Sequence, residues 1–372
     1  MLQKFFLLTL LLSFLACANQ KSQNYPEDVK LYHQLINKAS SHIVCYEFQM
    51  AMQKYKEAFQ YMREPFAIDI YNKMHVAIFI EDYDTMLECA KRLVSEKGMT
   101  LAPFEEATGY RDLRMQESYW EQFREWYPEG RESFLTTSNQ EDIQFFRQML
   151  EDDQKFRRHP ERYTTFLKQN DSIDQVNAKL LRDYIQTNGY PTENRIGVFE
   201  TSFRAGGVGK RVFRDFLNVV FRHYFGNFRK FDFDLSDILL EAVHHGHLHP
   251  ELYKQYMMQI MQIKPENENL IPGRAHEASV VHLINGKPYI TTIDEELIGL
   301  SDSLRAELYL SDSRTLFSKA AFTALNQDLP FNLFYANSVS IFEIPDPEQK
   351  EFNNKVLRLK LLENGEEYYD CD

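Results

Sequence analysis

The chain has little cysteine, no short catalytic motif and a deficit of positive charge. Only 4 cysteines occur in 372 residues, so the sequence does not resemble a disulfide-rich scaffold. It contains no Gly-x-Ser-x-Gly, His-Glu-x-x-His or Cys-x-x-Cys string, which excludes the motif-borne versions of hydrolase and redox chemistry. The net charge of −13 argues against a nucleic-acid-binding surface and against electrostatic attachment to anionic lipid.

The start of the chain carries a long apolar run. Lys4 precedes a largely apolar stretch over residues 5–12, and Leu15-Ala16-Cys17 follows it. A short basic segment, a short apolar segment and a small residue before the cleavage position indicate a secretory signal that is too short to span a bilayer. The Leu-Ala-Cys ending resembles the lipobox of bacterial lipoproteins. This resemblance implies cleavage after residue 16 and acylation of Cys17.

A lipobox implies a lipoprotein held outside the cytoplasm. Residues 1–16 are then the signal peptide, and residues 17–26 are the lipidated cysteine with its polar tether. Acyl chains such as palmitate anchor the chain to a membrane of the cell envelope, where it faces the periplasm or the cell surface. An odd number of cysteines remains after Cys17. A Cys45–Cys89 disulfide stays open as an alternative, but we expect both side chains to be buried free thiols.

Helical periodicity characterises residues 27–135. Apolar residues recur at three- and four-residue spacing, for example at Val29, Tyr32, Leu35 and Ile36. Residues 82–84 mark the turn between two later helices, and Gly98 is placed to end the second of them. This hairpin is similar to a single tetratricopeptide repeat unit, with no second unit in register. We predict an irregular helical-hairpin domain.

Two further parts follow a boundary at Pro128, Gly130 and residues 136–139. Residues 138–270 form a second helical domain, and one of its predicted apolar stripes consists of Val176, Leu180, Leu181, Tyr184 and Ile185. In residues 271–372, alternating segments around Asn285-Gly286 predict a β-hairpin, and later segments are also typical of strands. The predicted fold is therefore mostly α, with helical hairpins, a second helical domain and an α+β C-terminal part that contains a small antiparallel sheet.

Several short strings in the middle of the chain follow the order of a bacterial family. They lie at residues 153–157, 174–177, 188–191 and 242–251, with His223 between the last two. This succession resembles a family of uncharacterised proteins, the domain of unknown function six-six-two-four, over residues 140–310. Where that family has Asp-Arg and Tyr-Gly-Thr-Gln, this chain has residues 257–259 (Met-Met-Gln) and 275–278 (Ala-His-Glu-Ala). The resemblance implies a fold and no reaction, and an activity that needs those polar groups would be lost here.

Six polar residues of this part are the candidates for one site: Asp153, Gln154, Arg157, Asp174, Asn177 and His223. Asp153 and Arg157 are four positions apart on an expected helix, which favours an ion pair on one face. Asp174 and Asn177 are three apart and share a face as well. A histidine beside such carboxylates could carry protons or hold a metal. The plainer alternative is a surface ion pair and a hydrogen-bonded core histidine.

Three other strings resemble ligand sites without their full patterns. Residues 244–249 contain four histidines, but a turn between helices would splay the rings apart instead of aiming them at one metal. Residues 206–210 mimic a phosphate loop and lack the serine or threonine after the lysine. Residues 232–237 lack the glycine and the distal glutamate of a calcium loop. We predict no metal and no cofactor.

Two functions from different classes remain open. The first is a surface lipoprotein that binds a peptide or protein partner, but no nucleic acid, through its helical scaffold. The second is a hydrolytic enzyme with Asp153, Arg157, Asp174 and His223 around one cleft. A separation below about 4 Å between His223 and either carboxylate in a concave site favours the enzyme. Side chains that face apart favour the binding protein.

Overall fold

A computed structural model describes most of the chain between Tyr25 and Leu361. The described residues are 25–161, 164–198, 217, 220–221, 223–224, 231–263, 280–284, 287–291, 295–334, 340–344 and 359–361. Most of the described elements are helices, which confirms the prediction of a mostly α-helical chain. The predicted signal peptide, Cys17 and most of the tether lie outside the described residues, as do residues 206–210.

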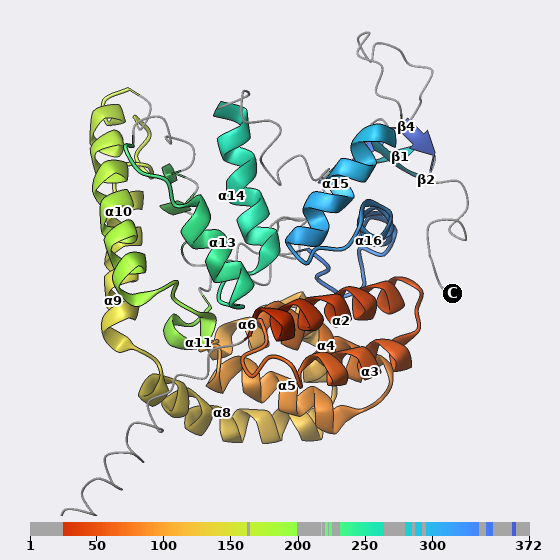
Figure 1. Cartoon of the computed structure of the whole chain (residues 1–372). Helices are drawn as coiled ribbons and strands as arrows, with labels where there is room; N and C mark the ends of the chain where they lie inside the picture. Colours follow the sequence, from red (N-terminus) through yellow and green to blue (C-terminus); the bar gives the residue numbers. More distant parts are fainter. Residues whose placement is uncertain are drawn as a thin grey trace, which may run out of the picture.

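The N-terminal helices pack as two consecutive hairpins in the lower layer of Figure 1. Helix α2 (Pro26–Val44) pairs with α3 (Phe48–Ala58), and α4 (Ala67–Phe79) pairs with α5 (Tyr83–Ser95). The predicted turn is confirmed, because the Asp82 side chain accepts a hydrogen bond from the Thr85 backbone N at 3.2 Å and so caps α5. Gly98 follows α5 with a φ of +68°, a conformation that glycine adopts without strain.

Short helices then lead to a long one that contains Pro128 and Gly130 and ends at Thr137, within the predicted boundary segment 136–139. These are α6 (Leu101–Glu106), a 3-10 turn (Thr108–Tyr110), α7 (Arg111–Met115) and α8 (Glu117–Thr137). The expectation of a break at Pro128 and Gly130 is wrong, since both lie inside α8. The Phe123 and Phe134 side chains are buried on either side of Pro128 and Gly130, and α8 packs against α5. Gly130 lies against the Trp126 ring, which a Cβ atom at position 130 would overlap.

The middle of the chain contributes α9 (Gln140–Gln154), α10 (Leu167–Asn188), α11 (Glu193–Ile196), α13 (Ser236–His244) and α14 (Pro250–Ile263). Helices α9 and α10 stand together on the left of Figure 1. The predicted stripe of α10 is partly wrong. Leu181 and Ile185 are buried, but Val176 and Leu180 are 54% and 42% exposed. The buried face instead continues through two polar residues, Asn177 and Asp174.

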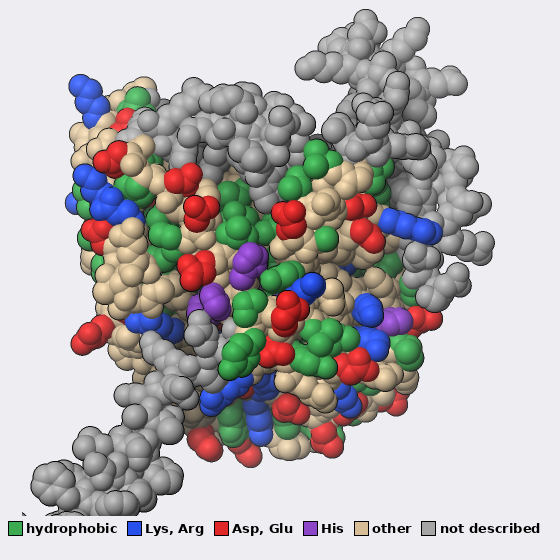
Figure 2. Space-filling view, in the orientation of Figure 1, with side chains coloured by type: hydrophobic (Ala, Val, Ile, Leu, Met, Phe, Trp, Pro, Cys, Tyr) green, Lys and Arg blue, Asp and Glu red, His purple; other side chains and the backbone are tan. Residues whose placement is uncertain are grey.

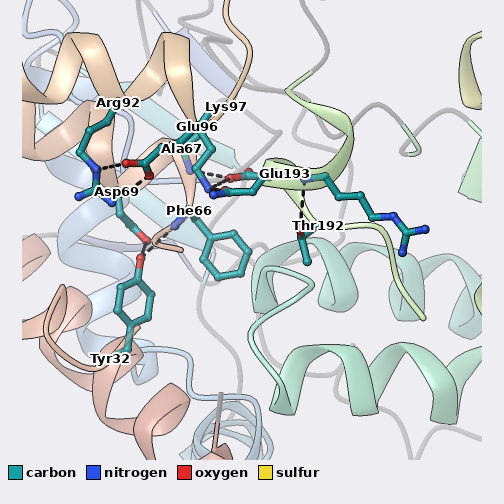
Figure 3. Close-up of polar contacts among 11 residues, drawn as sticks. Tyr32, Phe66, Ala67, Asp69, Arg92, Glu96, Lys97, Thr192 and Glu193 are labelled. Atoms are coloured by element: carbon teal, nitrogen blue, oxygen red, sulfur yellow. Dashed lines mark hydrogen bonds and ion pairs between the residues drawn. The ribbon is translucent and has the colours of Figure 1, made fainter. Parts of the chain in front are cut away.

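Polar contacts join the N-terminal layer to later parts of the chain. Glu193 of α11 accepts a hydrogen bond from the Ala67 backbone N at 2.7 Å, at the start of α4, and lies 3.3 Å from Lys97 Nζ (Figure 3). Asn72 of α4 exchanges hydrogen bonds of 2.7 and 2.8 Å with the backbone of Asn332. One continuous cluster of buried apolar side chains extends from Tyr32 to Phe331. The predicted parts therefore share a core.

The C-terminal part contains α15 (Glu295–Glu307), α16 (Ser313–Leu325) and four short strands. The strands are β1 (Val280–Ile284), β2 (Lys287–Thr291), β3 (Ser340–Ile344) and β4 (Leu359–Leu361), in the spatial order β3-β1-β2-β4. β1 pairs antiparallel with β2, and β2 with β4, whereas β1 and β3 are parallel. The arrangement is thus mixed, where the sequence predicted an antiparallel sheet. Residues 362–372, the last of the segments after the hairpin, lie outside the described residues.

One of the two described cysteines differs from the sequence expectation. Cys89 is a buried free thiol, as predicted. Cys45 is disulfide-bonded, so the expectation of a free thiol there is wrong. Helix α2 ends at Val44 and leaves Cys45 half-buried just beyond the helix, where a bonded partner can reach it. A Cys45–Cys89 bond is excluded because Cys89 is free.

Candidate functional site

The C-terminal end of α9 carries the first half of the candidate site. Asp153 is fully buried, and one of its oxygens, Oδ2, accepts a hydrogen bond from Gln154 Nε2 at 2.6 Å. Arg157 lies one turn further on and donates from Nη1 to the Asp153 backbone carbonyl at 2.7 Å. Its Nη1 is also 3.4 Å from Asp153 Oδ1. The predicted ion pair between positions 153 and 157 therefore exists, and it is buried on the Asp153 side.

Two separate segments complete the cluster. Asp174 of α10 is 5% exposed and accepts a hydrogen bond from Arg157 Nη2 at 2.6 Å. His223 Nδ1 lies 2.7 Å from Asp153 Oδ1, and 28% of the His223 side chain is exposed. The alternative of a lone surface ion pair is thus wrong, because both carboxylates are buried and share one guanidinium.

Asn177 has a different contact from the other five candidates. Its Nδ2 donates a hydrogen bond to the Met149 carbonyl at 3.2 Å. Met149 lies one turn before Asp153 on α9, and Asn177 lies about one turn after Asp174 on α10. Asn177 therefore links the two helices next to the charged cluster.

The electrostatics of the cluster are set by burial. Burial raises the pKa of Asp174, and the Arg157 guanidinium with its hydrogen bond lowers that pKa only in part. A raised carboxyl pKa means that the ionised form lacks compensation from its surroundings. Asp153, Asp174 and His223 each offer one ligand atom, and these three atoms lie within 4.8 Å of one another. The arrangement can hold a proton between histidine and carboxylate, or a cation among all three.

The histidine run at 244–249 makes different contacts. His249 is buried edge-on against the Phe66 and His33 rings, and burial lowers its pKa to about 4. Its Nδ1 accepts a hydrogen bond from the Glu251 backbone N at 3.2 Å, so it caps the start of α14. Within the described residues, no three groups of this run come together as metal ligands.

Sequence reasoning missed a second set of buried ionisable side chains between the layers. Tyr32 donates a hydrogen bond to Asp69, and burial raises the pKa of Asp69 to about 7 (Figure 3). Burial also lowers the pKa of Lys319 to about 8. Glu251 pairs with Lys254 at 2.9 Å. These residues sit within apolar helical stripes, where the sequence pattern gives no sign of a polar partner. Of this set, only Glu251 belongs to a string of the family resemblance, at residues 242–251.

Comparison with known proteins adds no relative. No family model matches the chain, and no curated protein or solved structure matches it. Among the described residues, no helix has both the length and the apolar character needed to cross a bilayer.

On the face shown in Figure 2, acidic and basic side chains are interspersed.

Proposed function

We propose that this chain is a lipid-anchored protein of the cell envelope whose middle part carries a hydrolytic site at Asp153, Arg157, Asp174 and His223. The contact that carries the enzyme hypothesis is the 2.7 Å separation of His223 Nδ1 and Asp153 Oδ1, on a fully buried carboxylate. The anchor rests on the Leu-Ala-Cys lipobox that ends at Cys17. The disulfide at Cys45 supports the same location, because disulfides persist in oxidising compartments.

The contacts support a role in hydrolysis for Asp153, His223 and Arg157. An ionised Asp153 accepts the Nδ1 proton of His223, which leaves Nε2 as the acceptor nitrogen of the ring. Nε2 then takes a proton from water as the water oxygen bonds to an acyl or phosphoryl centre. The same proton passes to the leaving group as its bond breaks. Arg157 forms ion pairs with both carboxylates and would place positive charge beside the developing anion.

Hydrolysis of chromogenic esters tests this site in the detergent-solubilised full chain. The substrates are p-nitrophenyl acetate and bis-p-nitrophenyl phosphate. We expect His223→Gln and Asp153→Asn each to lower the rate by about 10²- to 10⁴-fold on the substrate that is turned over. The exposed neighbours His159→Gln and Asp152→Asn are matched controls and should retain it. Equal rates for the wild type and His223→Gln on both substrates would refute the hydrolytic site.

The lipid anchor has its own test. Cys17→Ser removes the thiol that carries the acyl chains, so the variant should move from the membrane to the soluble fraction of the native host. A Cys89→Ser variant is the matched control, because Cys89 is a buried free thiol. Retention of Cys17→Ser in the membrane fraction would remove the lipoprotein assignment.

Binding of a peptide or protein partner through the helical scaffold is the second candidate. Its support is the packing of α2 to α5 as consecutive hairpins, an arrangement that repeat proteins use to bind extended partners. Co-purification of a partner with both the wild type and His223→Gln, without turnover, would favour this function. We also propose that residues 140–310 belong to the family that they resemble. The C-terminal part is proposed to be an α+β unit with a small sheet.

A further inference from the structure

The three side chains Asp153, Asp174 and His223 come from three separate segments and meet at one point. Their nearest ligand atoms lie within 4.8 Å of one another. Metal–ligand bonds of about 2.0–2.2 Å place neighbouring ligand atoms about 3 Å apart. His223 Nδ1 and Asp153 Oδ1, at 2.7 Å, already have a separation of this size. A small movement of Asp174 would complete a three-ligand set.

The charges at this point favour a cation. Two carboxylates are buried, and the one guanidinium of Arg157 contacts both of them. The guanidinium offsets part of the charge of the two carboxylates, and a bound cation would add to that compensation.

The surroundings would hold the ligands from behind and leave one side accessible. Gln154 donates a hydrogen bond to the Asp153 carboxylate, and Arg157 donates one to the Asp174 carboxylate, as the outer partners that orient metal ligands do. Asp153 and Asp174 are buried, whereas His223 is partly exposed, so an ion can approach from the histidine side. A set of three protein ligands with one open side is typical of catalytic metal sites.

We propose that Asp153, Asp174 and His223 bind one divalent transition metal, Zn²⁺ or Mn²⁺, through one oxygen of each carboxylate and Nδ1 of the imidazole. Imidazole together with carboxylate oxygen suits these ions. The inference rests on the proposed function, because it concerns the same site and names what activates water there. The metal would bind the Nδ1 lone pair of the tautomer that carries its proton on Nε2, and it would lower the pKa of a bound water to about 7. His223 would then be a ligand, and the metal-bound water would replace the water activated by Nε2. This departs from the metal-free site expected from the sequence.

Metal titration of the chelator-treated full chain tests the proposal. Zn²⁺ or Mn²⁺ is added in a calorimeter, and we expect about one ion per chain in the wild type. Asp153→Asn, Asp174→Asn and His223→Gln should each weaken binding at least tenfold, while Asp152→Asn binds as the wild type does. If Asp153→Asn does not fold, Asp174→Asn decides, because its amide oxygen still accepts the hydrogen bond from Arg157. Absence of binding, or equal binding by Asp174→Asn and the wild type, would overturn the metal site.

Activity with and without chelator separates this inference from the proposed function. Hydrolysis that needs His223 and disappears with the chelator supports both. Hydrolysis that needs His223 and persists without any bound ion overturns the metal and keeps the proton-transfer site. Stoichiometric binding lost in Asp174→Asn, with no hydrolysis of either ester, keeps the metal and overturns the hydrolytic function.

Discussion

Removal of the Arg157 charge should destabilise the fold, with a cost that depends on pH. Arg157→Gln leaves Asp153 and Asp174 buried without their guanidinium. Loss of one partner of a buried ion pair costs about 3–5 kcal/mol. A buried carboxylate that has lost its guanidinium can bind a proton and become neutral. At pH 7 this protonation costs about 4 kcal/mol, because an ordinary aspartate pKa of about 3.9 lies some three units lower and each unit is about 1.4 kcal/mol. At pH 5 it costs only about 1.5 kcal/mol.

We therefore expect Arg157→Gln to lose about 3–4 kcal/mol of unfolding free energy at pH 7 and about 1.5 kcal/mol or less at pH 5. Urea unfolding followed by circular dichroism at both pH values measures the loss. Arg158→Gln is the matched control, since Arg158 is an exposed neighbour and should change little. The double variant Arg157→Gln/Asp174→Asn should recover much of the loss at pH 7. A penalty that is equal at the two pH values would refute the reasoning.

Two further predictions concern the rest of the chain. The pKa of Asp69, raised by burial to about 7, lies above its unfolded value, so its stabilising contribution is complete below about pH 4 and is lost as the pH rises to 7. Asp69→Asn should accordingly gain about 4 kcal/mol of unfolding free energy relative to the wild type between pH 4 and pH 8; a pH-independent difference in urea unfolding would contradict this. For the cysteines, Cys45 is bonded and Cys89 is free, so an acylated Cys17 leaves Cys371 as the partner of Cys45. Non-reducing peptide mapping should recover that pair, and a free Cys45 thiol would contradict it.

Much of the helical architecture could be predicted from the sequence, because local chemistry decides where helices begin and end. The Asp82 cap of α5 and the positive φ at Gly98 each follow from the type of a single residue. The four-residue spacing of Asp153 and Arg157 likewise predicted their ion pair, although α9 ends at Gln154 and Arg157 lies in the turn that follows. Pro128 and Gly130 were misleading, because packing of α8 outweighs their low helix propensity.

The tertiary structure alone decided which faces are buried and which charges meet. Val176 and Leu180 are exposed, while Asp174 and Asn177 turn inward. A periodic pattern gives the repeat of a helix but does not specify the neighbour that covers each face. Asp153, Asp174 and His223 are separated by up to 70 positions, and only the packing of their segments brings them together. The sequence by itself thus determined the helices and the residue types available for a site, whereas contacts between distant segments, which no local pattern records, assembled that site.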